Sequence, residues 1–217
     1  MDQTLAQIDL HRWPVWQACL FGMALLVCIW GAVAWPAAFW PTGLVAIAFW
    51  TSISLGCMGV ALLHHLTGGR WGWGIGRELS AAISTAPLTG LFLLPLILAA
   101  RWVFPWARSL ADLNPHQQIY LAPPFVLTRT IVEWGLWTGL ALWHLKGYHR
   151  TAHDPTFRLP PRAAAVGLIL FWFSLTSASI DGLMSLEPVN NSSMFGAIEA
   201  IGCVVAGLAW VLLMRWQ

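Results

Sequence analysis

The stretch SASIDGLMSLEPVNNSSMF, from Ser177 to Phe195, ends one apolar run, makes a short acidic turn and begins the next apolar run. Asp181 lies inside the first run, Glu187 lies near its end, and Pro188 follows as a helix stop. An acidic side chain inside hydrocarbon costs a few kcal/mol or more unless it is paired or hydrated. We therefore interpret Asp181 as a candidate functional residue, whereas Glu187 also fits an ordinary helix end.

The composition of the whole chain is that of an integral membrane protein. Of its 217 residues, 58% are hydrophobic and only 9% are charged, and the mean hydropathy is +0.67. Soluble domains carry about 25% charged residues. The net charge of +2, without a basic patch interleaved with aromatic residues, gives no indication of nucleic-acid binding.

Six apolar runs predict an all-α fold, a single transmembrane domain over residues 1–217. Each has about the 20 residues that a helix needs to cross the hydrocarbon core, and Pro and Gly residues stand at the joints between them. We interpret the first run as a retained helix, because no small-residue cleavage site follows it. The predicted spans are 14–35, 41–66, 80–104, 121–145, 163–185 and 193–214.

Basic residues predict the orientation of these spans. If the spans alternate in direction, eight basic residues lie on the side of the N-terminus and two, Arg101 and Arg108, lie on the other. The positive-inside rule then places both termini in the cytoplasm. The eight are Arg12, Arg70, Arg77, Lys146, Arg150, Arg158, Arg162 and Arg215.

Four ionisable residues are expected in the outer half of the bundle. At about 1.5 Å per residue, Arg129 lies about 12 Å and Glu133 about 18 Å below the outer end of their span. Asp181 and Glu199 lie about 9 Å inside theirs. Arg129 and Glu133 are four residues apart and able to pair. Two interpretations remain: a neutralised structural ion pair, or a proton relay in which one of the carboxyl groups holds a proton.

Three histidines are expected in the cytoplasmic half. His64 and His65 near the end of one span face His144 near the end of another. Adjacent residues point about 100° apart on a helix, so one of the first two faces the bundle. Proton transfer, hydrogen bonding to a quinone, axial ligation of a b-type haem and simple interfacial packing are all compatible with this pattern.

Other motifs for metal binding or catalysis are absent from the sequence. The four cysteines lie singly in apolar runs, without a CxxC or CxxCH motif, which argues against c-type haem, iron–sulfur and structural zinc sites. The glycines from Gly68 to Gly76 lack the spacing of a nucleotide-binding loop and fit a helix end with a short connection. No catalytic residue, bound cofactor or metal ligand is therefore expected in this chain.

Three separated segments resemble one family. They are HHLTGGRWGW (His64–Trp73), IYLAPPFVLTRTIVEWGLW (Ile119–Trp137) and DGLMSLEP (Asp181–Pro188), the last followed by SSMFG (Ser192–Gly196). In this order the chain resembles the F-type membrane subunit of bacterial alternative complex III, a quinol:electron-acceptor oxidoreductase. That family is related to the membrane subunits of polysulphide reductase.

The resemblance implies a cofactor-free, non-catalytic helical subunit of the bacterial inner membrane, with a candidate role in proton movement. Its expected partners are a quinol-binding membrane subunit, a multihaem cytochrome c and an iron–sulfur protein, which would hold the haem c, the iron–sulfur clusters and the quinol. The residues carried over by position are His65, Arg70, Arg129, Asp181 and Glu187.

Two departures from the family pattern are visible. Family members usually continue into a second helical bundle, and they carry His-Trp after the SLEP segment, where this chain has Val189 and Asn190. The expected relay runs from the histidines through Glu133 to Asp181 with Glu199, and ends near Glu187. The alternatives are a purely structural or assembly subunit, and a b-type cytochrome or quinone-binding subunit.

Overall fold

The computed structural model describes residues 15–69, 71–111, 113–154, 156–188 and 192–216, and within these ranges all regular structure is helical. The elements are α1 (Val15–Ala34), α2 (Pro36–Thr67), η2 (Trp73–Ile75), α3 (Gly76–Ile83), α4 (Ala86–Leu98), α5 (Ala100–Val103), η3 (Pro105–Ala107), α6 (Pro115–Tyr120), α7 (Pro123–His153), α8 (Pro161–Gly182), η4 (Met184–Leu186) and α9 (Phe195–Trp216).

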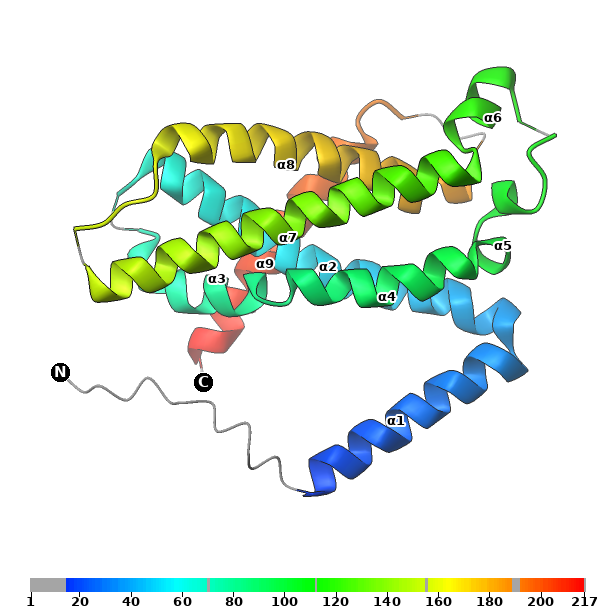
Figure 1. The fold of residues 1–217 in the computed structure, drawn as a ribbon, viewed down its shortest axis with the longest axis horizontal. Helices are drawn as coiled ribbons and strands as arrows, with labels where there is room; N and C mark the ends of the chain where they lie inside the picture. The colour runs from blue at the N-terminus through cyan, green and yellow to red at the C-terminus, as the bar shows by residue number, and fades with distance from the viewer. Residues whose placement is uncertain (1–14, 70, 112, 155, 189–191, 217) are drawn as a thin grey trace.

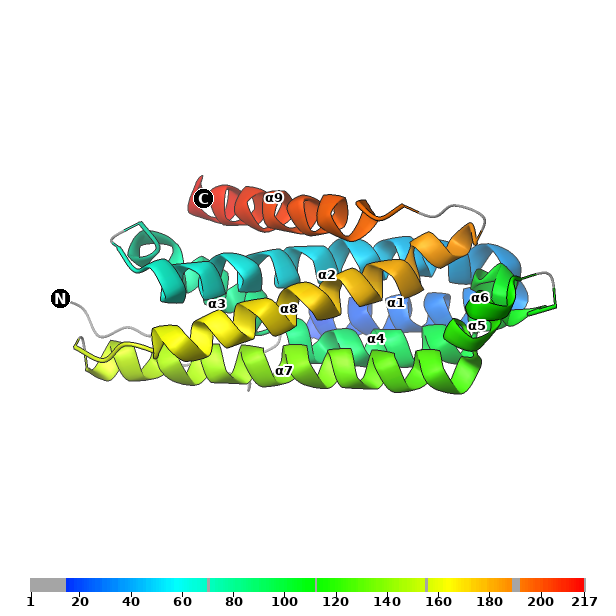
Figure 2. The same cartoon turned by 90° about the horizontal axis from the view of Figure 1, so that it is seen from above.

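Helix α2 is the centre of the bundle. It contacts α1, α3, α4, α5, α7, α8 and α9. Figure 2 shows it in a middle layer with α8, between α9 on one side and α4 with α7 on the other. Pro36 starts α2 at a position where the missing N–H costs nothing. Gly68 ends it with a φ of +69°, a conformation that favours glycine, and its N–H donates to the carbonyl of His64.

The contact between α2 and α9 depends on glycine. A Cβ built on Gly56 would lie 1.8 Å from the carbonyl oxygen of Cys203, and one built on Gly207 would lie 2.6 Å from the backbone nitrogen of Cys57. The thiol of Cys57 also donates to the carbonyl of Gly207 at 3.6 Å. Small residues let membrane helices approach backbone to backbone, and this contact fixes α9 against the core.

Five helical segments are long and apolar enough to cross a membrane, which is typical of a multi-pass membrane protein. They are Val15–Ala34, Pro36–Thr67, Gly76–Leu98, Pro161–Leu186 and Phe195–Trp216. Helix α7, which contains the predicted span 121–145, has 31 residues but is not among them. Charged residues such as Arg129 and Glu133 lower its hydropathy.

Two predicted spans differ in detail from the observed helices. The run 80–104 is divided among α3, α4 and α5, with a break at Ser84 and Thr85 between the first two. Pro41, expected at a joint, lies inside α2. Near a helix N-terminus a proline removes a single backbone hydrogen bond, and the apolar residues on both sides keep the helix continuous.

Helix α1 differs from the rest of the bundle in having no buried residue. Figure 1 shows it leading away from the other helices, joined to them near the start of α2. Its side chains are apolar around the whole circumference. A helix of this kind is suited to contact with lipid.

Candidate functional site

An ion pair joins α7 to α8. The Nε of Arg129 donates to Oδ2 of Asp181 at 2.7 Å and its Nη2 donates to Oδ1 at 2.9 Å, a two-pronged geometry. Nη2 also donates to the carbonyl of Tyr120 at 3.0 Å. The side chains of the pair are only 15% and 5% exposed. The sequence suggested Glu133 as the partner of Arg129, but the structure pairs Arg129 with Asp181.

Aromatic rings complete the surroundings of Arg129. Its guanidinium carbon lies 4.0 Å from the ring centre of Tyr120 and 4.5 Å from that of Phe125. Such contacts stabilise a cation that is removed from water. Its Nη1 is buried and has no hydrogen-bond partner in the part of the chain that the structure describes. The charge of Arg129 is therefore directed at Asp181.

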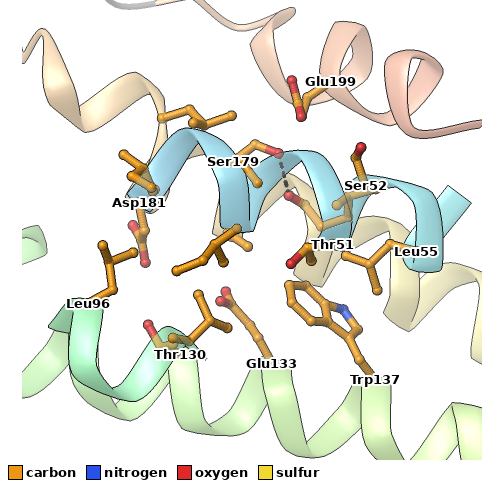
Figure 3. A pocket seen from close by; sticks show the side chains of 18 of the residues that line it. Thr51, Ser52, Leu55, Leu96, Thr130, Glu133, Trp137, Ser179, Asp181 and Glu199 are labelled. Atoms are coloured by element: carbon orange, nitrogen blue, oxygen red, sulfur yellow. Dashed lines mark hydrogen bonds between the residues drawn. The ribbon is translucent and has the colours of Figure 1, made fainter. Parts of the chain in front are cut away.

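Glu133 lies one turn along α7 from Arg129 and is 6% exposed. It faces a cavity of about 140 Å³, which we call the carboxylate cavity, together with Asp181 and Glu199. Figure 3 shows the carboxyl groups of Glu133 and Asp181 on the same side of α2. Hydroxyl-bearing side chains also line the cavity, and its remaining walls are mostly apolar. They are Thr51, Ser52, Thr130 and Ser179.

The other two predicted acidic residues differ in position. Glu199 reaches the carboxylate cavity from α9, on the side of α2 opposite Glu133, and is partly exposed (Figure 3). Glu187 ends η4, is exposed and does not line the carboxylate cavity. The structure thus brings together three of the four predicted carboxyl groups, those of Glu133, Asp181 and Glu199, around one cavity.

A second polar group joins α2, α3 and α7. The Nε2 of His65 lies 2.9 Å from Nδ1 of His144, and Nε2 of His144 lies 3.0 Å from Oγ of Ser80. His144 is 5% exposed. Two hydrogen arrangements satisfy both bonds, with the imidazole proton of His144 on either nitrogen. Moving one proton along each bond converts one arrangement into the other, so the three side chains form a short proton wire.

His64 does not belong to this wire. Its Nε2 donates to the carbonyl of Gly69 at 3.2 Å, and its ring centre lies 4.9 Å from that of Trp71. A Cβ on Gly72 would lie 2.2 Å from the His64 ring, so glycine is required there. The structure therefore assigns the inward-facing role to His65. Arg70, carried over from the family resemblance, lies outside the described residues.

Haem ligation by His65 and His144 does not fit this geometry. Two axial imidazole nitrogens on one iron are separated by about 4 Å, twice a metal–nitrogen bond of about 2 Å. The 2.9 Å between these nitrogens is a direct hydrogen bond and leaves no room for a metal between them. The described residues also include no group of three or more His, Cys, Asp or Glu side chains that could hold a metal ion.

An apolar layer separates the carboxylate cavity from the wire. It includes Met58, Leu62, Ala141 and Phe171, each at most 3% exposed. On α7 the layer spans seven residues, from Trp137 at the carboxylate cavity to His144, or about 10 Å. The two polar groups are therefore held by the same helices at different depths, without a polar contact between them among the described residues.

Sequence reasoning missed Ser80 and misjudged several other hydroxyl groups. Ser84, Thr85 and Thr89, expected to bond to a neighbouring helix or to water, each donate to the carbonyl three residues earlier in the chain. Ser80 lies one turn before Ser84, and its only sequence signal is a serine on the same expected span. Which of these serines faces His144 depends on how α3 is rotated, and its apolar residues do not specify that.

Comparison with known proteins adds no assignment. No protein-family model matches the chain, and no curated protein matches it in sequence.

Proposed function

We propose that this chain is a cofactor-free subunit of a bacterial respiratory quinol-oxidising complex similar to alternative complex III. In this proposal it lies in the inner membrane and provides a protonatable site inside the bilayer. The three sequence segments described above support the choice of complex. The expected partners are a quinol-binding membrane subunit, a multihaem cytochrome c and an iron–sulfur protein.

The topology we propose has six spans, with α7 as the fourth. Its 31 residues make a helix of about 46 Å, longer than the hydrocarbon core. The pairing of Arg129 with Asp181 supports a position inside the membrane, because a neutralised pair is far less costly there than a lone charge. The distribution of basic residues then supports cytoplasmic termini and a position of the wire in the cytoplasmic half.

The placement of Glu133 is the observation that supports a protonatable site. Asp181 has a cation and Glu133 does not, although both face the same cavity. A buried carboxylate without a partner is costly, and binding a proton removes that cost. Glu133 is therefore the group in this cavity that we propose gains and loses a proton, while Arg129 and Asp181 keep a fixed charge distribution.

The wire would provide the other half of the path. Ser80, His144 and His65 can pass a proton between the cytoplasmic half and the apolar layer. Crossing that layer requires water or a rearrangement of its side chains, since the four named above carry no titratable group. We therefore propose two half-paths, with Glu133 replacing Asp181 as the centre of the expected relay.

A structural role is the second candidate. The closed geometry of the Arg129–Asp181 pair favours it, because a two-pronged pair between α7 and α8 fixes their packing without any proton transfer. In that case Glu133 would fill the cavity and its protonation state would not change during turnover.

Purification from the native membrane in a mild detergent tests the choice of complex. We expect multihaem cytochrome and iron–sulfur proteins to co-purify, and a reduced-minus-oxidised spectrum in which no haem remains with this chain once it is separated. A chain that purifies alone, or that retains a b-type haem spectrum, would contradict the assignment.

Infrared spectroscopy of the Glu133→Gln variant tests the protonatable site. In the assembled complex we expect a carbonyl stretching band of a carboxylic acid that changes between oxidised and reduced states and is lost in Glu133→Gln. The Glu187→Gln variant serves as the matched control, because Glu187 is exposed. Retention of that band, with unchanged proton-to-electron stoichiometry, in Glu133→Gln would leave the structural role.

A further inference from the structure

A large open cavity lies where α2 and α7 end and α3 and α8 begin. Its volume is about 570 Å³, and we call it the histidine cavity because His64, His65 and His144 line it. Thr67 and Gly68, also in its lining, are exposed, so the cavity opens at the surface. It is separate from the carboxylate cavity and lies on the other side of the apolar layer.

The lining of the histidine cavity suits an anion. It includes the guanidinium of Arg158, the phenol of Tyr148 and three imidazoles, and none of the described lining residues is acidic. An arginine carries five N–H donors in a planar fork that matches the oxygens of a phosphate. The Nε2 of His64 must carry a hydrogen, because its partner, the carbonyl of Gly69, can only accept.

The surrounding surface has the same sign of charge. The end of α7 and the start of α8 carry Lys146, Arg150, Arg158 and Arg162. The only acidic residue between positions 146 and 162 is Asp154. Its Oδ1 accepts hydrogen bonds from the backbone nitrogen and the hydroxyl of Thr156 at 2.9 and 2.6 Å, so it closes the turn after α7.

The apolar part of the lining distinguishes a lipid from a free ion. Leu66, which is 39% exposed, lines the cavity, as do Leu159 and Pro161. Leu63, 45% exposed, lies one turn before Thr67 on α2. A headgroup in the cavity could thus continue into acyl chains on an apolar helix surface, which a free phosphate ion would not use.

We propose that the histidine cavity binds the phosphate group of an anionic phospholipid, with its acyl chains against α2 beside Leu63 and Leu66. Basic pockets between transmembrane helices at the cytoplasmic surface are suited to such headgroups. This site is independent of the proposed proton site, because it lies beyond the apolar layer and shares no residue with the carboxylate cavity.

Native mass spectrometry of the purified, delipidated chain tests this proposal. The probes are phosphatidylglycerol, phosphatidylcholine with the same acyl chains, and inorganic phosphate. We expect phosphatidylglycerol to bind at least tenfold more tightly than phosphatidylcholine. Equal binding of the two lipids, or binding of phosphate without binding of phosphatidylglycerol, would overturn the proposal.

Paired variants locate the site. Arg158→Gln should weaken phosphatidylglycerol binding about tenfold, the value of one hydrogen-bonded charged contact. Arg162→Gln removes the same charge from an exposed residue that does not line the cavity, and should weaken binding less than about threefold. Equal effects of the two substitutions would indicate general surface attraction and overturn the assignment.

A second pair changes space instead of charge. Ala152→Trp places a large ring at an exposed position of the cavity lining, and should reduce phosphatidylglycerol binding about as much as Arg158→Gln. Ala163→Trp adds the same ring at an exposed position outside the lining and should leave binding unchanged. Unchanged binding in Ala152→Trp would also contradict the proposed site.

Discussion

The two polar groups of the bundle use the same helix, α7, in different ways. Near its start, Arg129 and Asp181 form a charged pair in which each side chain requires the other. Two to three turns from its end, His144 is held by hydrogen bonds with His65 and Ser80 that need no formal charge. The charged group therefore fixes α7 against α8 at a high cost if it is broken, whereas the uncharged group can exchange protons at low cost.

Breaking the charged group should have the largest effect. Asp181→Asn removes the charge that compensates the buried guanidinium of Arg129, and loss of one partner of a buried pair costs about 3–5 kcal/mol. We expect a fall of that size in the free energy of unfolding, measured by SDS titration in mixed micelles. The control Glu187→Gln, at an exposed position, should change it by less than about 0.5 kcal/mol.

Removing both members of the pair sharpens the comparison. In the double variant Arg129→Met, Asp181→Leu no buried charge is left without a partner, so most of the lost stability should return. A double variant as unstable as Asp181→Asn would mean that the cost arises from packing and not from the uncompensated charge.

Breaking the uncharged group should have a moderate effect. Ser80→Ala leaves Nε2 of His144 without its partner in a buried position, and one unsatisfied polar group costs about 1–3 kcal/mol. The same SDS titration measures the loss. Ser84→Ala is the matched control one turn along the chain, because the Ser84 hydroxyl bonds only to its own helix, and it should cost less than about 0.5 kcal/mol. Equal losses would show that the Ser80–His144 bond is not important for stability.

Much of the fold followed from the sequence, because apolar run length predicts membrane helices directly. The break at Ser84 and Thr85 did not, since serine and threonine are tolerated inside helices and the run around them is apolar throughout. Helix α7 shows the opposite case. Its apolar residues predicted a span, but Arg129 and Glu133 lower its hydropathy, and only the pairing with Asp181 shows how one of these charges is compensated.

The members of the candidate site were easier to predict than their partners. Rare ionisable residues in apolar runs singled out Arg129, Glu133 and Asp181, because each is costly in hydrocarbon. Spacing along one helix favoured Arg129 with Glu133, and the structure instead pairs Arg129 with a residue of another helix. Contacts between helices depend on helix rotation, which runs that are apolar on nearly all sides do not specify.

The smallest effect is expected where the two carboxyl groups of one cavity are compared directly. Glu133→Gln makes the same chemical change as Asp181→Asn, in the same cavity and also in a buried side chain. Glutamine nearly matches a protonated glutamate in shape and has no charge, and no cation loses its partner, so the cost should be less than about 1 kcal/mol. SDS titration of the two variants side by side gives the difference. A loss in Glu133→Gln as large as that in Asp181→Asn would show that Glu133 is buried as a charged, compensated group, and the proton site would then have to be sought elsewhere in the bundle.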